Sequence, residues 1–124
     1  MRQFILMSSA VLSMFAVGCA TPQSVCETGA RNTCAKIFEC ASDALKSNST
    51  FQQSYGSNVD ECSARMSTAQ ECSGKKEFNQ LCADTTHEYD LGKASECSEA
   101  IEAQSCADFN DAAKRPAACG EICK

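Results

Sequence analysis

Apolar residues and cysteines return every three or four positions between residues 26 and 45. This spacing places them on one face of an α-helix of about twenty residues. Cys40 lies off that stripe, so the pattern predicts that it bridges to a different neighbour from Cys34. Residues 19–25 precede the helical pattern and are expected to form a short tether.

Turn-forming residues separate this helix from the next. Residues 47–50 have the composition of a loop, and residues 51–55 suit a short helical turn that Gly56 stops. Asn58, with a glutamate three residues later, resembles a capping box. That signal predicts a second long helix, which extends to about Cys72.

The second half of the sequence carries the same pattern less regularly. Residues 75–83 predict a third helix and residues 89–104 a fourth. Gly92 weakens the first turn of the fourth helix and favours a start nearer Ala94. Ser105, with an aspartate three residues later, restarts a short helix.

The chain ends on one more helical signal. Pro116 suits the first turn of a last helix, with Cys119 and Cys123 facing inward. The predicted fold class is all-α, a small disulfide-stapled helical bundle of about four to six helices after a cleaved signal peptide. Glu-Cys-Ser occurs at residues 61–63 and again at 96–98, which indicates either a duplicated hairpin or a chance echo.

The first eighteen residues differ from the rest of the chain. Arg2 is followed by an apolar run, interrupted only by serines, from Phe4 to Val17. A charged start, a short apolar stretch and a small-residue exit are typical of a secretory signal peptide. The run is shorter than the roughly 20 apolar residues that a transmembrane helix needs. An ordinary buried N-terminal helix is the alternative interpretation.

Two cleavage sites fit the end of this leader. Ala16-Val17-Gly18-Cys19 resembles the lipobox of bacterial lipoproteins, where the cysteine carries diacylglycerol and acyl chains such as palmitate. That family usually has leucine where this chain has Ala16. The rival is ordinary signal peptidase cutting after Ala20, which would remove Cys19. We favour the lipobox, and therefore expect lipidation of Cys19.

Either outcome leaves ten cysteines free to pair, because lipidation blocks Cys19 and the rival cut removes it, and this even number suits five disulfide bonds. The spacing contains no Cys-x-x-Cys pair of the kind that binds zinc. An exported chain also meets oxidising conditions, so we expect disulfides and no metal or other cofactor. Spacing alone does not give the connectivity. The predicted disulfide-forming residues are Cys26, Cys34, Cys40, Cys62, Cys72, Cys82, Cys97, Cys106, Cys119 and Cys123.

The predicted hydrophobic core is small. From Cys19 onward only twelve of 106 residues are Leu, Ile, Val or Phe, and chains with less than roughly 20% of these residues are usually disordered. Disulfides offset this deficit, because each contributes about 2–4 kcal/mol, largely by restricting the unfolded chain. We therefore expect that the reduced protein does not fold stably. The aromatic residues either line a ligand cavity or, more simply, build the core: Phe38, Phe51, Tyr55, Phe78 and Phe109.

Charge and the remaining polar residues argue against several function classes. The formal charge is −5, and −6 once Arg2 is removed with the leader, which argues against a nucleic-acid partner. The single histidine, His87, is either a general base beside Glu88 and Asp90 or, more often, a solvated side chain. No Gly-x-Ser-x-Gly or His-Glu-x-x-His motif accompanies it. We expect no enzyme activity and no catalytic residues.

Four short motifs follow one another along the chain: Cys-Ala-Lys-Ile-Phe-Glu-Cys at 34–40, Tyr55-Gly56-Ser57 before Cys62, Ser-Cys-Ala-Asp-Phe at 105–109 and Pro-Ala-Ala-Cys at 116–119. Their order resembles that in small cysteine-rich lipoproteins of myxobacteria and related deltaproteobacteria. The resemblance implies an exported α-helical domain behind a lipobox leader and supplies no catalytic residue. Ala20 stands where similar lipoproteins retained in the inner membrane have aspartate, which implies the outer membrane.

The expected organisation is a signal peptide at 1–18, a lipidated N-terminus and tether at 19–25, and a cysteine-rich α-helical domain at 26–124. The expected role is structural or protein-binding at the cell envelope, with the lipid on Cys19 attaching the domain to the membrane. Acidic helix faces would then meet a protein partner. One alternative is a binder of a small apolar ligand, which predicts an enclosed apolar cavity. Another is a released effector or inhibitor, cut after Ala20.

Overall fold

The computed structural model describes residues 19–124, and the signal peptide predicted over residues 1–18 lies outside the described residues. Within residues 19–124 the regular structure is helical, apart from an isolated antiparallel bridge between Tyr89 and Cys123. The all-α prediction is confirmed. The α-helices are α1 (Pro22–Cys40), α2 (Asp43–Lys46), α3 (Ser49–Tyr55), α4 (Val59–Ala69), α5 (Leu91–Ala103) and α6 (Cys106–Phe109). Single 3₁₀ turns are η2 (Cys72–Gly74), η3 (Phe78–Leu81), η4 (Ala112–Lys114) and η5 (Ala117–Gly120).

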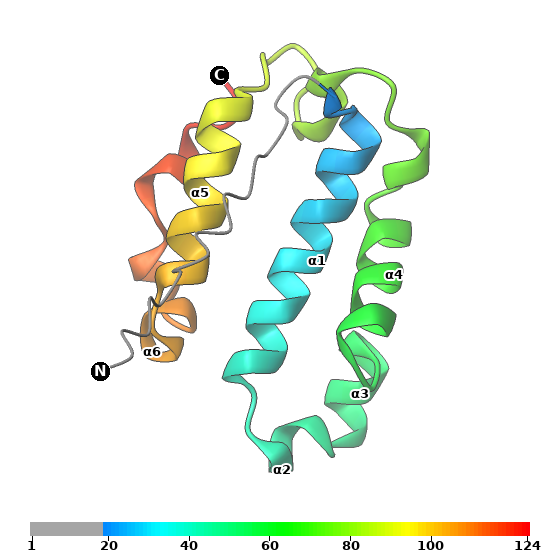
Figure 1. Cartoon of the computed structure of the whole chain (residues 1–124), viewed down its shortest axis with the longest axis vertical. Coiled ribbons are helices and arrows are strands. Elements are labelled where there is room, and N and C mark those ends of the chain that lie inside the picture. Colours follow the sequence, from blue (N-terminus) through cyan, green and yellow to red (C-terminus); the bar gives the residue numbers. More distant parts are fainter. Residues whose placement is uncertain (1–18) are drawn as a thin grey trace, which may run out of the picture.

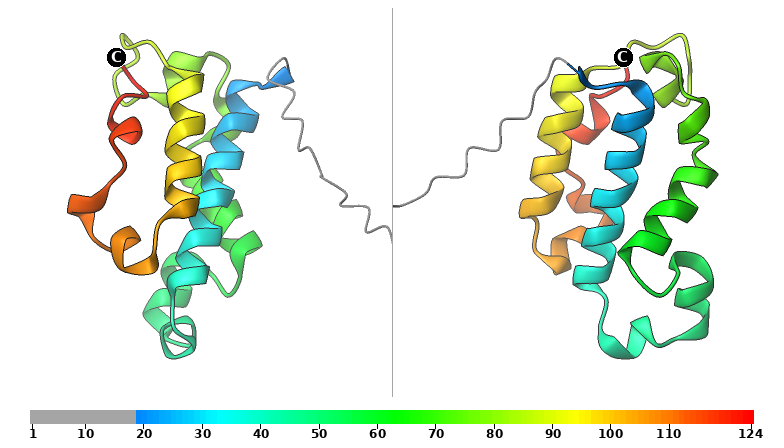
Figure 2. Two further views of the ribbon diagram at one scale, coloured as in Figure 1. Left: turned by 60° about the vertical axis from the view of Figure 1, so that its left-hand side comes forward. Right: turned by 45° about the vertical axis from the view of Figure 1, so that its right-hand side comes forward.

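The central helix is α1, which lies between α4 on one side and α5 on the other (Figure 1). α4 runs antiparallel to α1 and α5 runs parallel to it, and the same layer is visible from two other sides (Figure 2). α2 and α3 close the end where α1 finishes. η3 and the connection into α5 lie at the opposite end, and the C-terminal segment returns along α5 to reach it.

α1 begins earlier than the hydrophobic pattern predicts. The Thr21 hydroxyl accepts the Ser24 N–H at 3.1 Å, and Ser24 Oγ accepts the Thr21 N–H at 2.9 Å, which completes a capping box. Pro22 follows at the first helical position, where its missing N–H costs no hydrogen bond. The tether predicted over residues 19–25 is therefore wrong for residues 22–25, because capping residues carry no hydrophobic signal.

The single helix predicted to reach residue 45 is divided in two. α1 ends at Cys40, Ala41 takes an extended backbone, and the Ser42 hydroxyl accepts the Leu45 N–H to cap α2. The loop predicted at residues 47–50 is correspondingly shorter, because Asn48 caps α3.

The turn between α3 and α4 follows the prediction closely. Gly56 stops α3 with φ of +79°, and a Cβ there would lie 2.6 Å from the Cβ of Glu61, so only glycine fits. Asn58 Oδ1 accepts the Glu61 N–H at 2.9 Å. The Glu61 carboxylate accepts the N–H of Ser57 at 2.7 Å, so it bonds one residue ahead of the N-cap.

The segment after α4 is less helical than predicted. α4 ends at Ala69 rather than near residue 72, and Glu71 then turns the chain with a left-handed φ of 54°. The helix predicted over residues 75–83 is reduced to the single turn η3. η3 ends at Leu81 because Cys82, which is bonded to Cys123, takes an extended backbone.

The start of α5 also differs from the prediction. Asp90 Oδ1 accepts the Lys93 N–H at 2.9 Å, so α5 begins at Leu91 although Gly92 follows directly. Ser105 caps α6 as predicted, accepting the Asp108 N–H at 3.1 Å. The last predicted helix is only the 3₁₀ turn η5.

The core consists mainly of cysteines. Its one buried large aromatic side chain among the described residues is Phe51, 7% exposed. The ring of Phe51 lies 5.4 Å from that of Phe38, edge to face, and 5.0 Å from that of Tyr55. These three aromatics pack against one another at the end of the molecule that α2 and α3 close. The buried hydrophobic residues are Cys26, Ala30, Cys34, Ala41, Phe51, Cys62, Cys72, Cys82, Cys97 and Cys119.

Candidate functional site

The ten cysteines after Cys19 form five disulfide pairs. Two are nested within residues 22–74, which we call the N-terminal half, and two within residues 75–124, the C-terminal half. The fifth pair joins the halves, and because Cys40 and Cys34 have partners in different halves, the prediction that they bridge to different neighbours is confirmed. The pairs are Cys26–Cys72 enclosing Cys34–Cys62, Cys82–Cys123 enclosing Cys97–Cys119, and the linking pair Cys40–Cys106.

Cys19 is exposed and lies outside this set of pairs. It stands two residues before Thr21, the N-cap of α1. A group attached to its sulfur would therefore lie at the end of the molecule where α1 begins, clear of the helical layer. Lipidation of Cys19 stays a prediction.

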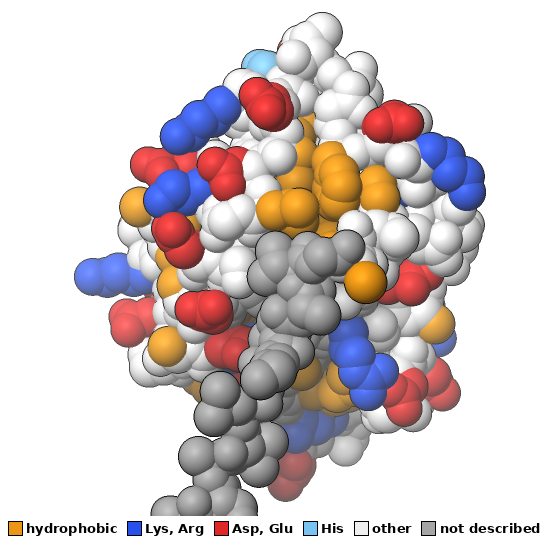
Figure 3. Space-filling view, turned by 45° about the horizontal axis from the view of Figure 1, so that its top comes forward, with side chains coloured by type: hydrophobic (Ala, Val, Ile, Leu, Met, Phe, Trp, Pro, Cys, Tyr) orange, Lys and Arg blue, Asp and Glu red, His pale blue; other side chains and the backbone are white. Residues whose placement is uncertain are grey.

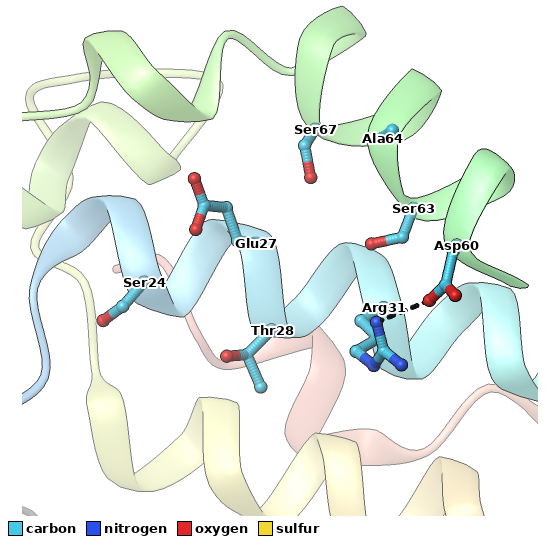
Figure 4. A pocket seen from close by; sticks show the side chains of 8 residues that line it. All are labelled: Ser24, Glu27, Thr28, Arg31, Asp60, Ser63, Ala64 and Ser67. Carbon is cyan, nitrogen blue, oxygen red and sulfur yellow. Dashed lines mark hydrogen bonds and ion pairs between the residues drawn. The ribbon is translucent and has the colours of Figure 1, made fainter.

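A polar groove of about 520 Å³ runs between α1 and α4 (Figure 4). The Arg31 guanidinium donates to the Asp60 carboxylate at 2.9 Å across it, and both side chains are largely exposed. Glu27 faces the same hollow from α1. Small residues on α4 keep the hollow open. The lining residues are Ser24, Glu27, Thr28, Arg31, Asp60, Ser63, Ala64 and Ser67.

The walls of this groove are fixed in position. Cys26–Cys72 joins the start of α1 to η2, directly after α4, and Cys34–Cys62 joins the middle of α1 to the first turn of α4. All four of these cysteines are buried. A groove between two cross-linked helices keeps its shape without a ligand, which lowers the conformational entropy that binding costs.

A second groove, of about 640 Å³, lies between α1, η3 and the C-terminal segment. Val25, Leu81, Tyr89 and Ile122 give it an apolar part, and Arg115 is among the polar residues that line it. Burial raises the pKa of the Tyr89 phenol, whose ring stacks on Phe78 with centroids 6.1 Å apart. The groove is open, so it is not the enclosed cavity that a carrier of an apolar ligand would need.

Figure 3 shows the end of the molecule where α1 begins. A small group of hydrophobic side chains lies there, bordered by acidic and basic side chains in mixed order. Because the two signs alternate around the apolar group, this face carries no single-sign field of the kind that attracts nucleic acid.

His87 lies in an exposed turn. Its Nε2 is 4.0 Å from Asp84 Oδ2, and both side chains are about half exposed. The Thr86 hydroxyl donates to Asp84 Oδ1, which lowers the pKa of that carboxyl group. Neither Glu88 nor Asp90 makes an ion pair with the imidazole, since Asp90 caps α5. The imidazole is about half exposed to solvent, and the absence of a catalytic role stays a prediction.

One cluster brings metal-binding residue types together. A carboxylate oxygen of Glu39 and the sulfurs of Cys40 and Cys106 all lie within 4.8 Å of one another. The two sulfurs are bonded to each other, so neither is a thiolate that could bind a cation. The cluster is therefore part of a disulfide environment in this structure.

Lys36 is a buried cation that sequence reasoning missed. It is 4% exposed, and its ammonium group donates to Glu39 Oε1 at 3.2 Å and to the Glu102 carbonyl at 3.1 Å. Asn32, one turn earlier, donates to Ser98 Oγ at 3.0 Å. These bonds form the polar contact between α1 and α5. Lys36 is buried because α5 covers the side of α1 that carries it, and the hydrophobic stripe in the sequence did not indicate this.

No protein-family model, curated protein or solved structure matches the chain. The resemblance to myxobacterial lipoproteins therefore stays a prediction. Among the residues that the structure describes, no helix is both long and apolar enough to span a membrane. Five disulfides in so small a domain fit an exported protein.

Proposed function

We propose that the chain is an exported lipoprotein, anchored through Cys19 to the bacterial outer membrane, whose helical domain binds a protein partner at the cell envelope. The leader pattern and the five disulfides together support export of the chain. The anchor rests on the lipobox-like residues that end in Cys19. In this proposal the domain has no catalytic role.

The observation that carries the binding role is the cross-linked polar groove between α1 and α4. It is lined by two carboxylates, one guanidinium and several hydroxyls, so it is hydrophilic and slightly acidic. Arg31 and Asp60 neutralise each other, which leaves Glu27 as the free charge. A partner segment with a basic residue and hydrogen-bonding groups complements this lining, and electrostatic complementarity sets specificity at such surfaces.

A charge reversal with a matched control tests the groove. Glu27→Lys reverses a charge inside it, and Glu99→Lys reverses one on α5 outside it. Both carboxylates are exposed in the middle of a helix, and both accept a side-chain hydrogen bond from the residue four positions earlier. A photo-cross-linking amino acid at Ser67 would report contacts inside the groove in intact cells. We expect one cross-linked partner with the unchanged chain and with Glu99→Lys, and none with Glu27→Lys.

Cross-linking that survives Glu27→Lys would contradict a partner in the groove. Equal loss with Glu99→Lys would indicate a general effect of charge instead. The anchor needs its own measurement, which is the intact mass of protein purified from its own cells. An acylated chain starting at Cys19 supports the proposal, and a chain starting at Thr21 would replace it with the released effector or inhibitor.

The other candidate is a binder of a small apolar ligand, which would have to lie on the apolar part of the open second groove, since that groove is not an enclosed cavity. Gly29 lines it, and a Cβ at that position would meet no atom within 4 Å. Gly29→Leu therefore adds an apolar side chain at the groove wall, and its Cβ meets no other atom. If the delipidated protein takes up a fluorescent fatty acid, Gly29→Leu should abolish uptake while the helix content stays the same. Failure of the unchanged protein to bind fatty acid or sterol analogues counts against this candidate.

A further inference from the structure

The disulfide between Cys40 and Cys106 differs from the other four in its exposure. Each of the other pairs has at least one buried cysteine, whereas Cys40 and Cys106 are both partly exposed. A dissolved thiol must reach a sulfur along the S–S axis to exchange with it, so access limits which disulfide reacts. Among the five pairs, this one offers the freest approach.

The same disulfide is the only one that joins the two halves. The chain itself passes from the N-terminal half to the C-terminal half at the end of the molecule where α1 begins. Cys40 and Cys106 lie at the opposite end, at the last residue of α1 and the first residue of α6 (Figure 1). The two halves are thus connected at one end by the chain and at the other by a sulfur bridge.

Between these two connections the contact of α1 with α5 includes a polar part. Asn32 bonds Ser98, and Lys36 bonds the Glu102 carbonyl. Such hydrogen bonds contribute little net free energy, because water replaces them when the surfaces part. The described buried core holds no large apolar side chain from either of these helices. The sulfur bridge is the one disulfide that ties the end of α1 to the C-terminal half.

We propose that Cys40–Cys106 is a thiol–disulfide exchange site that reacts with a dithiol, such as the reduced active site of an envelope disulfide oxidoreductase. Its reduction releases the C-terminal half from the end of α1, while the four other disulfides keep each half folded. The proposal goes beyond the binding role and does not depend on lipidation of Cys19.

The exchange is balanced by the dithiol alone. One thiolate of the reagent attacks the sulfur of Cys40 or Cys106, the S–S bond breaks, and the other cysteine leaves as a thiolate that takes up a proton. The second thiol of the reagent then closes on the mixed disulfide. Two electrons pass from the dithiol to the protein, which ends with two thiols, and the reagent ends with one disulfide.

Glu39 should slow thiol–disulfide exchange at this bond, and most of all for reagents that carry additional negative charge. Its carboxylate lies within 4.8 Å of both sulfurs, and Lys36 offsets its charge only in part, through one contact of 3.2 Å. A negative charge there opposes an incoming thiolate, and the opposition grows when the reagent carries further negative charge. Glu39→Gln should raise the exchange rate about two- to fivefold for a tripeptide thiol such as glutathione, and less for neutral dithiothreitol. A purely structural role for Glu39 would change both rates equally.

Limited reduction of the intact, fully oxidised protein tests the proposal. The protein is exposed to low dithiothreitol at neutral pH, the new thiols are alkylated at intervals, and peptides are mapped by mass spectrometry. We expect Cys40 and Cys106 to be alkylated at least about tenfold faster than any other pair, as access predicts. Earlier reduction of a different pair, or loss of all five pairs together, would overturn the assignment.

A double variant tests the release of the halves. Cys40→Ser with Cys106→Ser should retain four disulfides and show faster amide hydrogen exchange in α5 and α6, with α1 and α4 unchanged. The oxidised unchanged protein is the reference. Unchanged exchange in α5 and α6 would show that the other contacts hold the halves together, and would overturn the release.

Discussion

The N-terminal and C-terminal halves have the same disulfide pattern, one pair nested inside another, but they bury different amounts of side chain. The N-terminal half pairs two long helices and adds the aromatic cluster around Phe51. In the C-terminal half one helix packs against 3₁₀ turns, and its buried hydrophobic residues among those described are all cysteines. The same covalent pattern therefore supports a partly hydrophobic core in one half and replaces such a core in the other.

This comparison also answers the question of a duplicated hairpin. Cys62 of the first Glu-Cys-Ser motif and Cys72 after it both bond to α1. Cys97 of the second motif bonds to η5, and Cys106 after it bonds to α1. Equivalent cysteines have different partners, so the repeated motif in the sequence does not correspond to a repeated unit in the structure.

Complete reduction should have the largest effect. Five disulfides at about 2–4 kcal/mol each contribute about 10–20 kcal/mol, which is as large as the whole net stability of an ordinary domain, roughly 5–15 kcal/mol. We expect reduced and alkylated protein to lose most of its far-ultraviolet circular dichroism, with any residual helix confined to the N-terminal half. Native-like helix content after full reduction would show that the apolar contacts are sufficient alone.

Truncation of an aromatic ring should lower the free energy of unfolding more in the N-terminal half than in the C-terminal half. Phe51→Ala removes the buried ring of the N-terminal half and should cost about 3 kcal/mol. Phe78→Ala removes a half-buried ring that stacks on Tyr89, and should cost about 1 kcal/mol. Urea unfolding of both oxidised variants measures the difference. Equal losses would mean that the halves are built alike.

The sequence predicts the N-terminal half better than the C-terminal half, for the same reason that the two cores differ. The long helices carry their cysteines and apolar residues at regular spacing, so both α1 and α4 were predicted, although each ends earlier than expected. Gly56 and Asn58 correctly marked the turn between α3 and α4. In the C-terminal half disulfides replace apolar periodicity, so the third and last predicted helices proved to be single 3₁₀ turns. The disulfide connectivity, the burial of Lys36 and the two grooves depend on how the helices pack against one another. The hydrophobic pattern of a single sequence does not specify that packing.

Replacement of the buried lysine should weaken the contact between the halves. Lys36→Met keeps the length of the side chain but leaves the Glu102 carbonyl without its donor, which should cost about 1–2 kcal/mol. Glu39 is mostly exposed, so its loss of a partner adds little. Amide exchange should rise in α5 and stay constant in α4. Asn32→Ala is the control at the same surface and should have about half the effect. Unchanged amide exchange in α5 of Lys36→Met would contradict this role.

The smallest effects should come from helix glycines. Gly29→Ala places a Cβ in open space on α1 and should stabilise the protein by about 0.5–1 kcal/mol, because glycine loses more backbone entropy on folding. Gly92→Ala on α5 brings a Cβ to 3.2 Å from the capping Asp90 Oδ1, so the gain there should be smaller. Urea midpoints measure both. A larger gain at Gly92 would show that the cap of α5 tolerates the added methyl group.

The central claim is that two separately cross-linked halves are joined by one disulfide. Its most direct test is the disulfide map of the native protein, digested without reduction under acidic conditions that prevent exchange. The account predicts linked peptides for the two nested pairs in each half, and Cys40–Cys106 as the single link between residues 22–74 and 75–124. A second link between the halves, or a free thiol among the ten cysteines, would contradict it.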